Sequence, residues 1–141
     1  MKVLLYLCAT TTLLLCGCKS SQNASSAFSP LDGEWEILSL KDCPLQAGRQ
    51  QPTVRFDAHQ GRVSAYAGCN RMSGRLVKAK KGSLQIQGMA STRMACMDMR
   101  AEDALSKVLS QAASYRIGKD GQLLVYDGEK QELLSAKRKG E

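Results

Sequence analysis

Short runs of alternating apolar and polar residues follow one another along most of the chain. Alternation with a period of two puts successive side chains on opposite faces of a strand, so each run predicts a half-buried β-strand. Short breaks that contain glycine or aspartate separate the runs, and such breaks join antiparallel neighbours. The pattern predicts a meander of strands at Glu34–Leu40, Thr53–Asp57, Arg62–Tyr66, Arg75–Lys78, Leu84–Gln87, Tyr115–Ile117, Leu123–Tyr126 and Glu132–Ala136.

One segment has the period of a helix instead. From Ala101 to Ala112, apolar residues recur at offsets of three, four, seven, eight and eleven, which is one face of a helix. Asp98 is expected to be its N-cap, and Glu102 and Asp103 are interpreted as exposed charges near the positive end of the helix dipole. We therefore expect a mainly β (α+β) fold, an antiparallel barrel-like sheet with one helix packed against its concave side.

The N-terminal residues indicate export and lipidation. Lys2 precedes an apolar stretch from Val3 to Leu15, which is shorter than the roughly 20 residues of a membrane-spanning helix. The following Leu-Cys-Gly-Cys resembles bacterial lipoprotein processing sites. This resemblance implies that residues 1–17 are a signal peptide removed before Cys18, whose thiol is then acylated. Ordinary secretion, with cleavage farther along the chain, is the alternative.

The rest of the chain divides into a tether, one domain and a short tail. Residues 18–30 are rich in Ser, Asn, Gln and Ala, which predicts a flexible lipidated tether. Residues 31–137 are expected to form the domain, and residues 138–141 a charged tail. The residue after the acylated cysteine is Lys19 and not an aspartate. By analogy with known sorting, the absence of an aspartate there predicts the outer membrane, facing the periplasm, if the cell has two membranes.

Basic residues outnumber acidic ones by 20 to 13, which gives a net charge of +7. In a bacterial envelope, such a surface favours anionic lipid headgroups, lipopolysaccharide or acidic cell-wall polymers over nucleic acid. A solvated face without a ligand is the alternative. The excess is concentrated in one segment, where only Asp57 opposes Arg49, Arg55, Arg62, Arg71, Arg75, Lys78, Lys80 and Lys81.

Two cysteine-containing segments carry the most specific pattern. Gly68–Gly74 reads Gly-Cys-Asn-Arg-Met-Ser-Gly, which predicts a turn or bulge between strands. Thr92–Cys96 reads Thr-Arg-Met-Ala-Cys and is expected to be a loop that leads into the helix. One cysteine in each segment indicates a covalent clamp in an oxidising compartment, and two buried unpaired thiols are the alternative.

Together the two segments resemble the paired signature of the META/HslJ family of small envelope lipoproteins, and Gly33-Glu34-Trp35 resembles the opening of that family. The resemblance covers roughly residues 31–136 and implies the same barrel-like sheet with one helix. It also implies a disulfide between Cys69 and Cys96, since both lie in the motifs and Cys43 lies outside them. Such a cross-link stabilises a domain by about 3–4 kcal/mol.

The polar residues of the signature have two interpretations. Arg71 and Arg93 are candidates for recognition of an anion or carboxylate through bidentate hydrogen bonds. Alternatively, both guanidinium groups brace loop carbonyls or a carboxylate, and Asn70 satisfies the backbone of the turn. The structural interpretation is favoured, because polar groups that become buried in a turn need partners.

Residues for catalysis or metal binding are sparse. His59 is the single histidine and falls in a predicted hairpin turn, and no base lies beside Cys69 or Cys96 in the sequence. The cysteines and His59 lack the paired spacing of metal sites, and no phosphate-binding glycine motif is present. We therefore predict that the protein is not an enzyme and has no metal or cofactor.

The leading hypothesis is a non-enzymatic, membrane-anchored envelope lipoprotein that acts as a binding or interaction module in envelope maintenance. Its role in stress resistance is implied by the resemblance alone, whose named bacterial member is a heat-shock lipoprotein. The alternative is a barrel that carries a lipid or small apolar ligand, or a pilot-like partner of a secretion protein. The two hypotheses differ in the free volume that remains inside the barrel.

Overall fold

The computed structural model of the 141-residue chain describes residues 29–46 and 50–140. The predicted signal peptide, the lipidation site Cys18, most of the tether and Arg49 lie outside the described residues. The domain itself is described almost completely.

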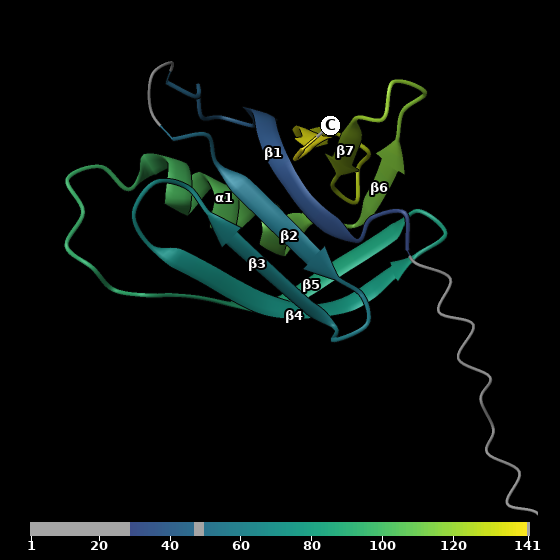
Figure 1. The fold of residues 1–141 in the computed structure, drawn as a ribbon, viewed down its shortest axis with the longest axis horizontal. Helices are drawn as coiled ribbons and strands as arrows, with labels where there is room; N and C mark the ends of the chain where they lie inside the picture. The colour runs from purple at the N-terminus through teal and green to yellow at the C-terminus, as the bar shows by residue number, and fades with distance from the viewer. Residues whose placement is uncertain (1–28, 47–49, 141) are drawn as a thin grey trace, which may run out of the picture.

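Eight antiparallel strands form a closed barrel in which each strand pairs with the next and β8 pairs with β1 (Figure 1). The predicted mainly β fold with one helix is therefore confirmed. The elements, in chain order, are β1 Gly33–Leu40, β2 Thr53–Asp57, β3 Arg62–Tyr66, β4 Arg71–Lys80, β5 Ser83–Ser91, α1 Arg100–Gln111, β6 Ser114–Ile117, β7 Leu123–Tyr126 and β8 Glu132–Arg138.

Apolar side chains from every strand fill the interior of the barrel. Period-two alternation points one set of side chains inward, as in β2, where Val54 and Phe56 are buried and Arg55 is exposed. Trp35 of β1 is fully buried, and its Nε1 donates a hydrogen bond of 2.9 Å to the carbonyl oxygen of Leu31. The inward-facing apolar residues of the described strands thus form one core.

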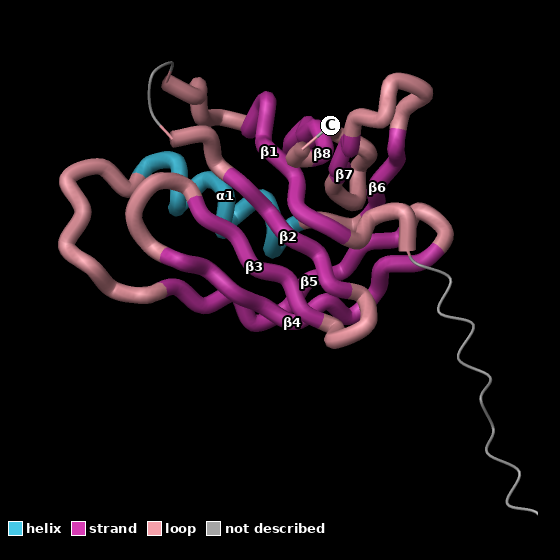
Figure 2. Tube along the Cα trace, in the orientation of Figure 1, coloured by secondary structure: helices cyan, strands magenta, loops and turns pink. Residues whose placement is uncertain are grey.

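The helix covers the part of the barrel wall where neighbouring strands share the fewest residue pairs. β5 and β6 share a single residue pair, Ser83 with Ser114, and α1 is the connection between these two strands (Figure 2). Leu105, Val108 and Leu109 of α1 are buried in the core, as the apolar face predicted. Because the helix packs mainly on β5, it seals a wall that has few backbone hydrogen bonds of its own.

Two strands are longer than the pattern predicted. β4 begins at Arg71 rather than Arg75, and β5 extends to Ser91 rather than Gln87. Their pairing shifts register at Ser73/Arg75 and at Leu76/Lys78. Because each bulge reverses the side-chain alternation, a period-two pattern does not continue through it.

The predicted N-cap of the helix is wrong. Met99 is the N-cap residue, without a side-chain capping bond, and the helix starts at Arg100. The Asp98 carboxylate instead accepts hydrogen bonds from the backbone N–H and the guanidinium of Arg100. This hydrogen bond raises the pKa of Arg100 above its usual value. An ion pair two residues apart has replaced the cap.

The last residues of β8 hold the beginning of the domain in place. The guanidinium of Arg138 donates hydrogen bonds of 2.7 Å to the carbonyl oxygen of Asp32 and 2.9 Å to that of Pro30. It also lies over the ring of Trp35, 4.4 Å from the centroid. Arg138 is therefore part of the barrel rather than of the predicted charged tail at 138–141.

Candidate functional site

The two signature segments, Gly68–Gly74 and Thr92–Cys96, lie side by side at one end of the barrel. Residue pairing between β4 and β5 reaches Met72 and Ser91, and the backbone N–H of Thr92 donates to the carbonyl oxygen of Arg71 at 3.0 Å. The first described residues leave the barrel at its opposite end (Figure 1). The fold thus separates the signature from the start of the domain.

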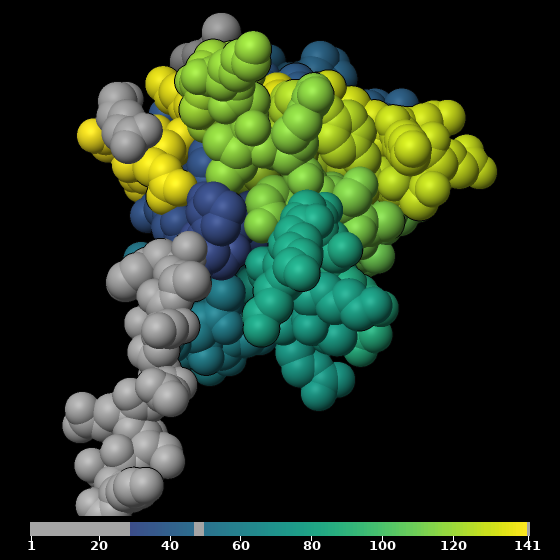
Figure 3. Space-filling model, turned by 90° about the vertical axis from the view of Figure 1, so that its right-hand side faces the viewer, coloured from purple at the N-terminus to yellow at the C-terminus, as the bar shows by residue number. Residues whose placement is uncertain are grey.

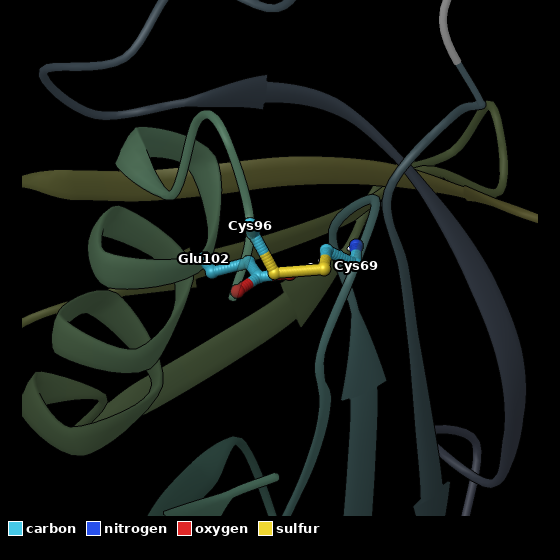
Figure 4. A group of neighbouring side chains, drawn as sticks. All are labelled: Cys69, Cys96 and Glu102. Carbon is cyan, nitrogen blue, oxygen red and sulfur yellow. Dashed lines mark hydrogen bonds between the residues drawn. A yellow bond between two sulfur atoms is a disulfide. The ribbon is translucent and has the colours of Figure 1, made fainter. Parts of the chain in front are cut away.

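A disulfide joins the segments. Cys69 and Cys96 are bonded, with their Cα atoms 6.3 Å apart, and the bridge lies beside α1, next to Glu102 (Figure 4). This is the pair that the family resemblance implied. Cys43 is a free, half-buried thiol that lines a shallow surface hollow with Leu38 and Leu45. The covalent clamp therefore ties the loop after β3 to the loop before the helix.

A buried carboxylate lies directly beneath this bridge. Glu102 of α1 is only 3% exposed, and one of its oxygens accepts the backbone N–H groups of Cys69, at 2.8 Å, and of Asn70. Its other oxygen accepts the side-chain amide of Asn70 at 3.0 Å. Three donors therefore hold the negative charge, which is how a buried carboxylate is accommodated.

Asn70 connects this carboxylate to the second signature segment. Its side chain is fully buried, and its Oδ1 accepts the Thr92 hydroxyl at 2.9 Å and the backbone N–H of Met94 at 2.8 Å. Its Nδ2 also lies 3.2 Å from Sγ of Cys96. Asn70 thus satisfies loop backbone, as its structural interpretation states. Within residues 29–46 and 50–140, no buried side-chain nitrogen or oxygen lacks a hydrogen-bond partner.

The prediction that Glu102 is an exposed dipole charge is wrong, because the residue lies on the core face of the helix. Its position, three residues before Leu105 and seven before Leu109, places the three side chains on one stripe. A carboxylate on an apolar stripe signals a buried polar partner, and Asn70 is that partner. The sequence contained this signal, and the prediction from the helix dipole overlooked it.

The same cluster contains the atoms of a potential metal site. The sulfurs of Cys69 and Cys96 and a carboxylate oxygen of Glu102 lie within 4.8 Å of one another. The two sulfurs are bonded to each other, however, and the carboxylate already accepts three hydrogen bonds. A metal ion needs thiolates and free lone pairs, so this oxidised donor set does not fit one.

The two signature arginines point away from the network. Arg71 and Arg93 are both exposed, and the guanidinium of Arg71 lies 5.9 Å from the centre of the Tyr66 ring. In the described part of the chain, neither guanidinium donates a hydrogen bond or forms an ion pair. The bracing of loop carbonyls that was predicted for them is therefore without support from their contacts.

A different set of arginines forms an exposed cluster, which we call the cationic face: Arg55, Arg62 and Arg75, on the outside of β2, β3 and β4. Arg62 lies directly opposite Arg75 in the pairing of β3 with β4, and Arg55 is diagonal to Arg62. All three are exposed, and none forms an ion pair with a carboxylate of the described residues, although Asp57 lies opposite Arg62 in the pairing of β2 with β3. Like charges opposite each other in a sheet repel, so this face is suited to an anion from outside.

Comparison with known families assigns the fold. The model of the META domain matches residues 29–140. The chain belongs to the META domain family. Residues 29 and 30, which the sequence pattern assigned to the tether, are thus part of the META domain, in agreement with the hydrogen bonds of Pro30 to Arg138 and of Ser29 to Ala79.

Two solved structures resemble this META domain. The NMR structure of a protein from Burkholderia xenovorans is 22% identical with a TM-score of 0.58, and the match covers 79% of this chain and 85% of that one. The crystal structure of a DUF4847 family protein from Bacteroides vulgatus is 11% identical with a TM-score of 0.55, and covers 79% and 96%. At these identities the likeness shows the fold. Comparison with curated proteins finds no significant match.

Within the described ranges, the META domain has no helix with the length and apolarity that crossing a membrane requires.

His59 lies in the turn between β2 and β3, as the sequence analysis predicted.

Proposed function

We propose that this META domain is a non-enzymatic binding module of the bacterial envelope, anchored by acyl chains on Cys18, and that its cationic face binds anionic envelope components. The observation that carries the proposal is the facing pair Arg62 and Arg75, which are exposed and form no ion pair with a carboxylate of the described chain. Guanidinium groups bind carboxylates and phosphates in bidentate geometry, so an acidic polymer or headgroup would relieve their repulsion.

The use of the signature residues in the structure supports a function without catalysis. Glu102 cannot act as a general base while three donors occupy its oxygens, and Cys69 and Cys96 are oxidised. The carboxylate and the two thiols, which are the reactive groups of this region, thus stabilise the fold. Recognition would then depend on exposed surface residues.

The packing of the core favours a surface-binding module over a carrier with an internal ligand. Fully buried side chains from β1, β2, β7 and β8, together with Leu105 and Leu109 of α1, occupy the space that such a ligand would need. Three hollows among the described residues open at the surface. A pilot-like role toward a secretion protein remains compatible with the same exposed faces.

The predicted compartment agrees with the disulfide, because oxidised cysteines persist outside the cytoplasm. The lipoprotein processing pattern before Cys18 supports anchoring in the envelope, at the outer membrane and facing the periplasm in a cell with two membranes. Mass spectrometry of the mature N-terminus tests this part, since acylation adds a defined mass to Cys18. The role in stress resistance follows from the family resemblance alone.

Replacing Arg62 and Arg75 by Gln is expected to weaken the binding of a soluble anionic polymer, such as polyglucuronate, by about thirtyfold, since two surface charges at roughly 1 kcal/mol each amount to about 2 kcal/mol. Binding would be measured by titration of the polymer into the mature lipoprotein held in zwitterionic nanodiscs. The thermal midpoint should stay unchanged or rise slightly, because the change removes repulsion between facing charges.

The matched control is the double change Lys107→Gln and Lys130→Gln, which removes the same charge from two exposed residues outside the cationic face. Equal losses in both double variants would reduce the effect to net charge and overturn the assignment of the cationic face. Unchanged binding in the arginine variant would do the same.

A further inference from the structure

The barrel end at which the described chain begins has a surface groove of about 890 Å³. Figure 3 views this end, where the first described residues lie beside the β4–β5 segment and β6. Leu76, Ala79 and Tyr115 are largely buried and form an apolar floor, and Val77 is 44% exposed at the margin. An exposed valine next to an apolar floor is suited to contact a hydrocarbon chain.

The rim of this groove is basic. Lys80 and Lys81 at the β4–β5 turn and Arg116 of β6 line the groove and are exposed. The carboxylate on this rim, Asp32, is already engaged, because its two oxygens accept the backbone N–H groups of Ala58 at 2.6 Å and Ser29 at 3.1 Å. The groove therefore combines an apolar floor with a positive rim, which matches an anionic amphiphile.

The chain connects this groove to the membrane anchor of the proposed function. Ser29 is part of the groove wall, and its hydroxyl donates to the carbonyl oxygen of Ala79 at 3.2 Å. Residues 19–28, which are ten residues, separate it from Cys18. Ten residues span at most about 35 Å when fully extended. The groove thus lies at the point of the domain where the tether to the bilayer is attached.

We propose that the groove binds an anionic phospholipid of the bilayer in which the protein is anchored, an inference that rests on the proposed function. Lys80, Lys81 and Arg116 contact the phosphate, and Val77 and Ile117 contact the first part of the acyl chains. The domain is then seated on the membrane by its tether end. The signature segments, which lie at the opposite end of the barrel, point away from the membrane (Figure 1).

The test is photo-cross-linking of the full mature protein to vesicles that contain a diazirine phosphatidylglycerol or the matching phosphatidylcholine. We expect labelled peptides from residues 76–82 and 114–118, with labelling by phosphatidylglycerol stronger than by phosphatidylcholine. Reversing the rim charges with Lys80→Glu and Lys81→Asp should reduce the labelling by about tenfold, since each basic residue near an anionic surface contributes to binding. Aspartate suits position 81, because Lys81 has a positive φ of 52°.

The control reversal is Lys107→Glu with Lys130→Asp, two exposed residues that do not line this groove, and Lys130 has a positive φ as Lys81 does. Equal labelling by the two lipids, or equal loss in both reversals, would overturn the proposal. Preferential labelling at the cationic face would also overturn it and would make the cationic face of the proposed function the lipid-binding surface. Mass spectrometry of the same sample reports acylation of Cys18 separately, so an unacylated protein would contradict the anchor while the labelling still tests the groove.

Discussion

Replacing Glu102 by alanine is expected to lower the free energy of unfolding by about 3–5 kcal/mol. The change removes the acceptor of three hydrogen bonds and leaves the backbone N–H groups of Cys69 and Asn70 buried beneath the disulfide. A buried donor without a partner costs its full desolvation, which is more than the net value of the bond. Urea unfolding, followed by the fluorescence of Trp35, measures the change.

The neighbouring carboxylate provides a matched control. Asp103 lies in the same first turn of α1 and is exposed, so Asp103→Ala should change stability by less than about 1 kcal/mol. Glu102→Gln keeps one acceptor oxygen but places a donor toward the side-chain amide of Asn70, and should fall between the two. Similar effects of Glu102→Ala and Asp103→Ala would contradict a structural role of the buried carboxylate.

Removing the disulfide by replacing Cys69 and Cys96 with alanine is expected to cost about 3–4 kcal/mol. The bridge closes a loop with a sequence separation of 27, and its main contribution in the chain-entropy treatment is to restrict the unfolded chain. A single small domain has about 5–15 kcal/mol of stability in total, so this loss should lower the thermal midpoint strongly. Reduction of the unaltered protein with dithiothreitol should reproduce it.

Cys43→Ala is the control for this change, because the free thiol is half-buried and makes no bridge. It should cost less than about 1.5 kcal/mol. The disulfide and Glu102 are in contact through Cys69 and Asn70, so their combined loss should differ from the sum of the separate losses. Strict additivity would show that the bridge and the carboxylate stabilise the loops independently.

Much of the barrel follows from local patterns. The runs around Val54, Val63 and Val125 alternate cleanly and form strands at the predicted places. The full lengths of β4 and β5 do not follow, because two bulges reverse the alternation near Ser73 and Leu76. Closure of the sheet was expected only as a barrel-like shape, since pairing of β1 with β8 joins segments about a hundred residues apart.

The site was predictable in part. The pairing of Cys69 with Cys96 came from the family resemblance, which also singled out Asn70. Glu102 was missed, because a charge near a helix start was interpreted through the dipole rather than through its place on the apolar face. The basic segment was evident from composition, but that Arg62 faces Arg75 depends on strand register, which composition does not contain.

The two ends of the barrel differ in the chemistry of their residues. The signature end is closed by a disulfide and by a buried carboxylate that is fully hydrogen-bonded. The tether end and the outer surface of β2–β4 present basic groups to the surroundings. Substitutions at the signature should therefore act through stability, and substitutions on the basic surfaces through binding.

Amide hydrogen exchange at Cys69, Asn70 and Met94 tests most directly whether the signature segments stabilise the fold as a rigid, hydrogen-bonded unit. These three amides lie in loops, yet each donates to the side chain of Glu102 or Asn70. We expect them to exchange as slowly as the slowest strand amides, through global unfolding alone, and to become fast in Glu102→Ala. If these amides exchange in the unaltered protein as fast as those of open loops, the structural role of the signature segments is contradicted.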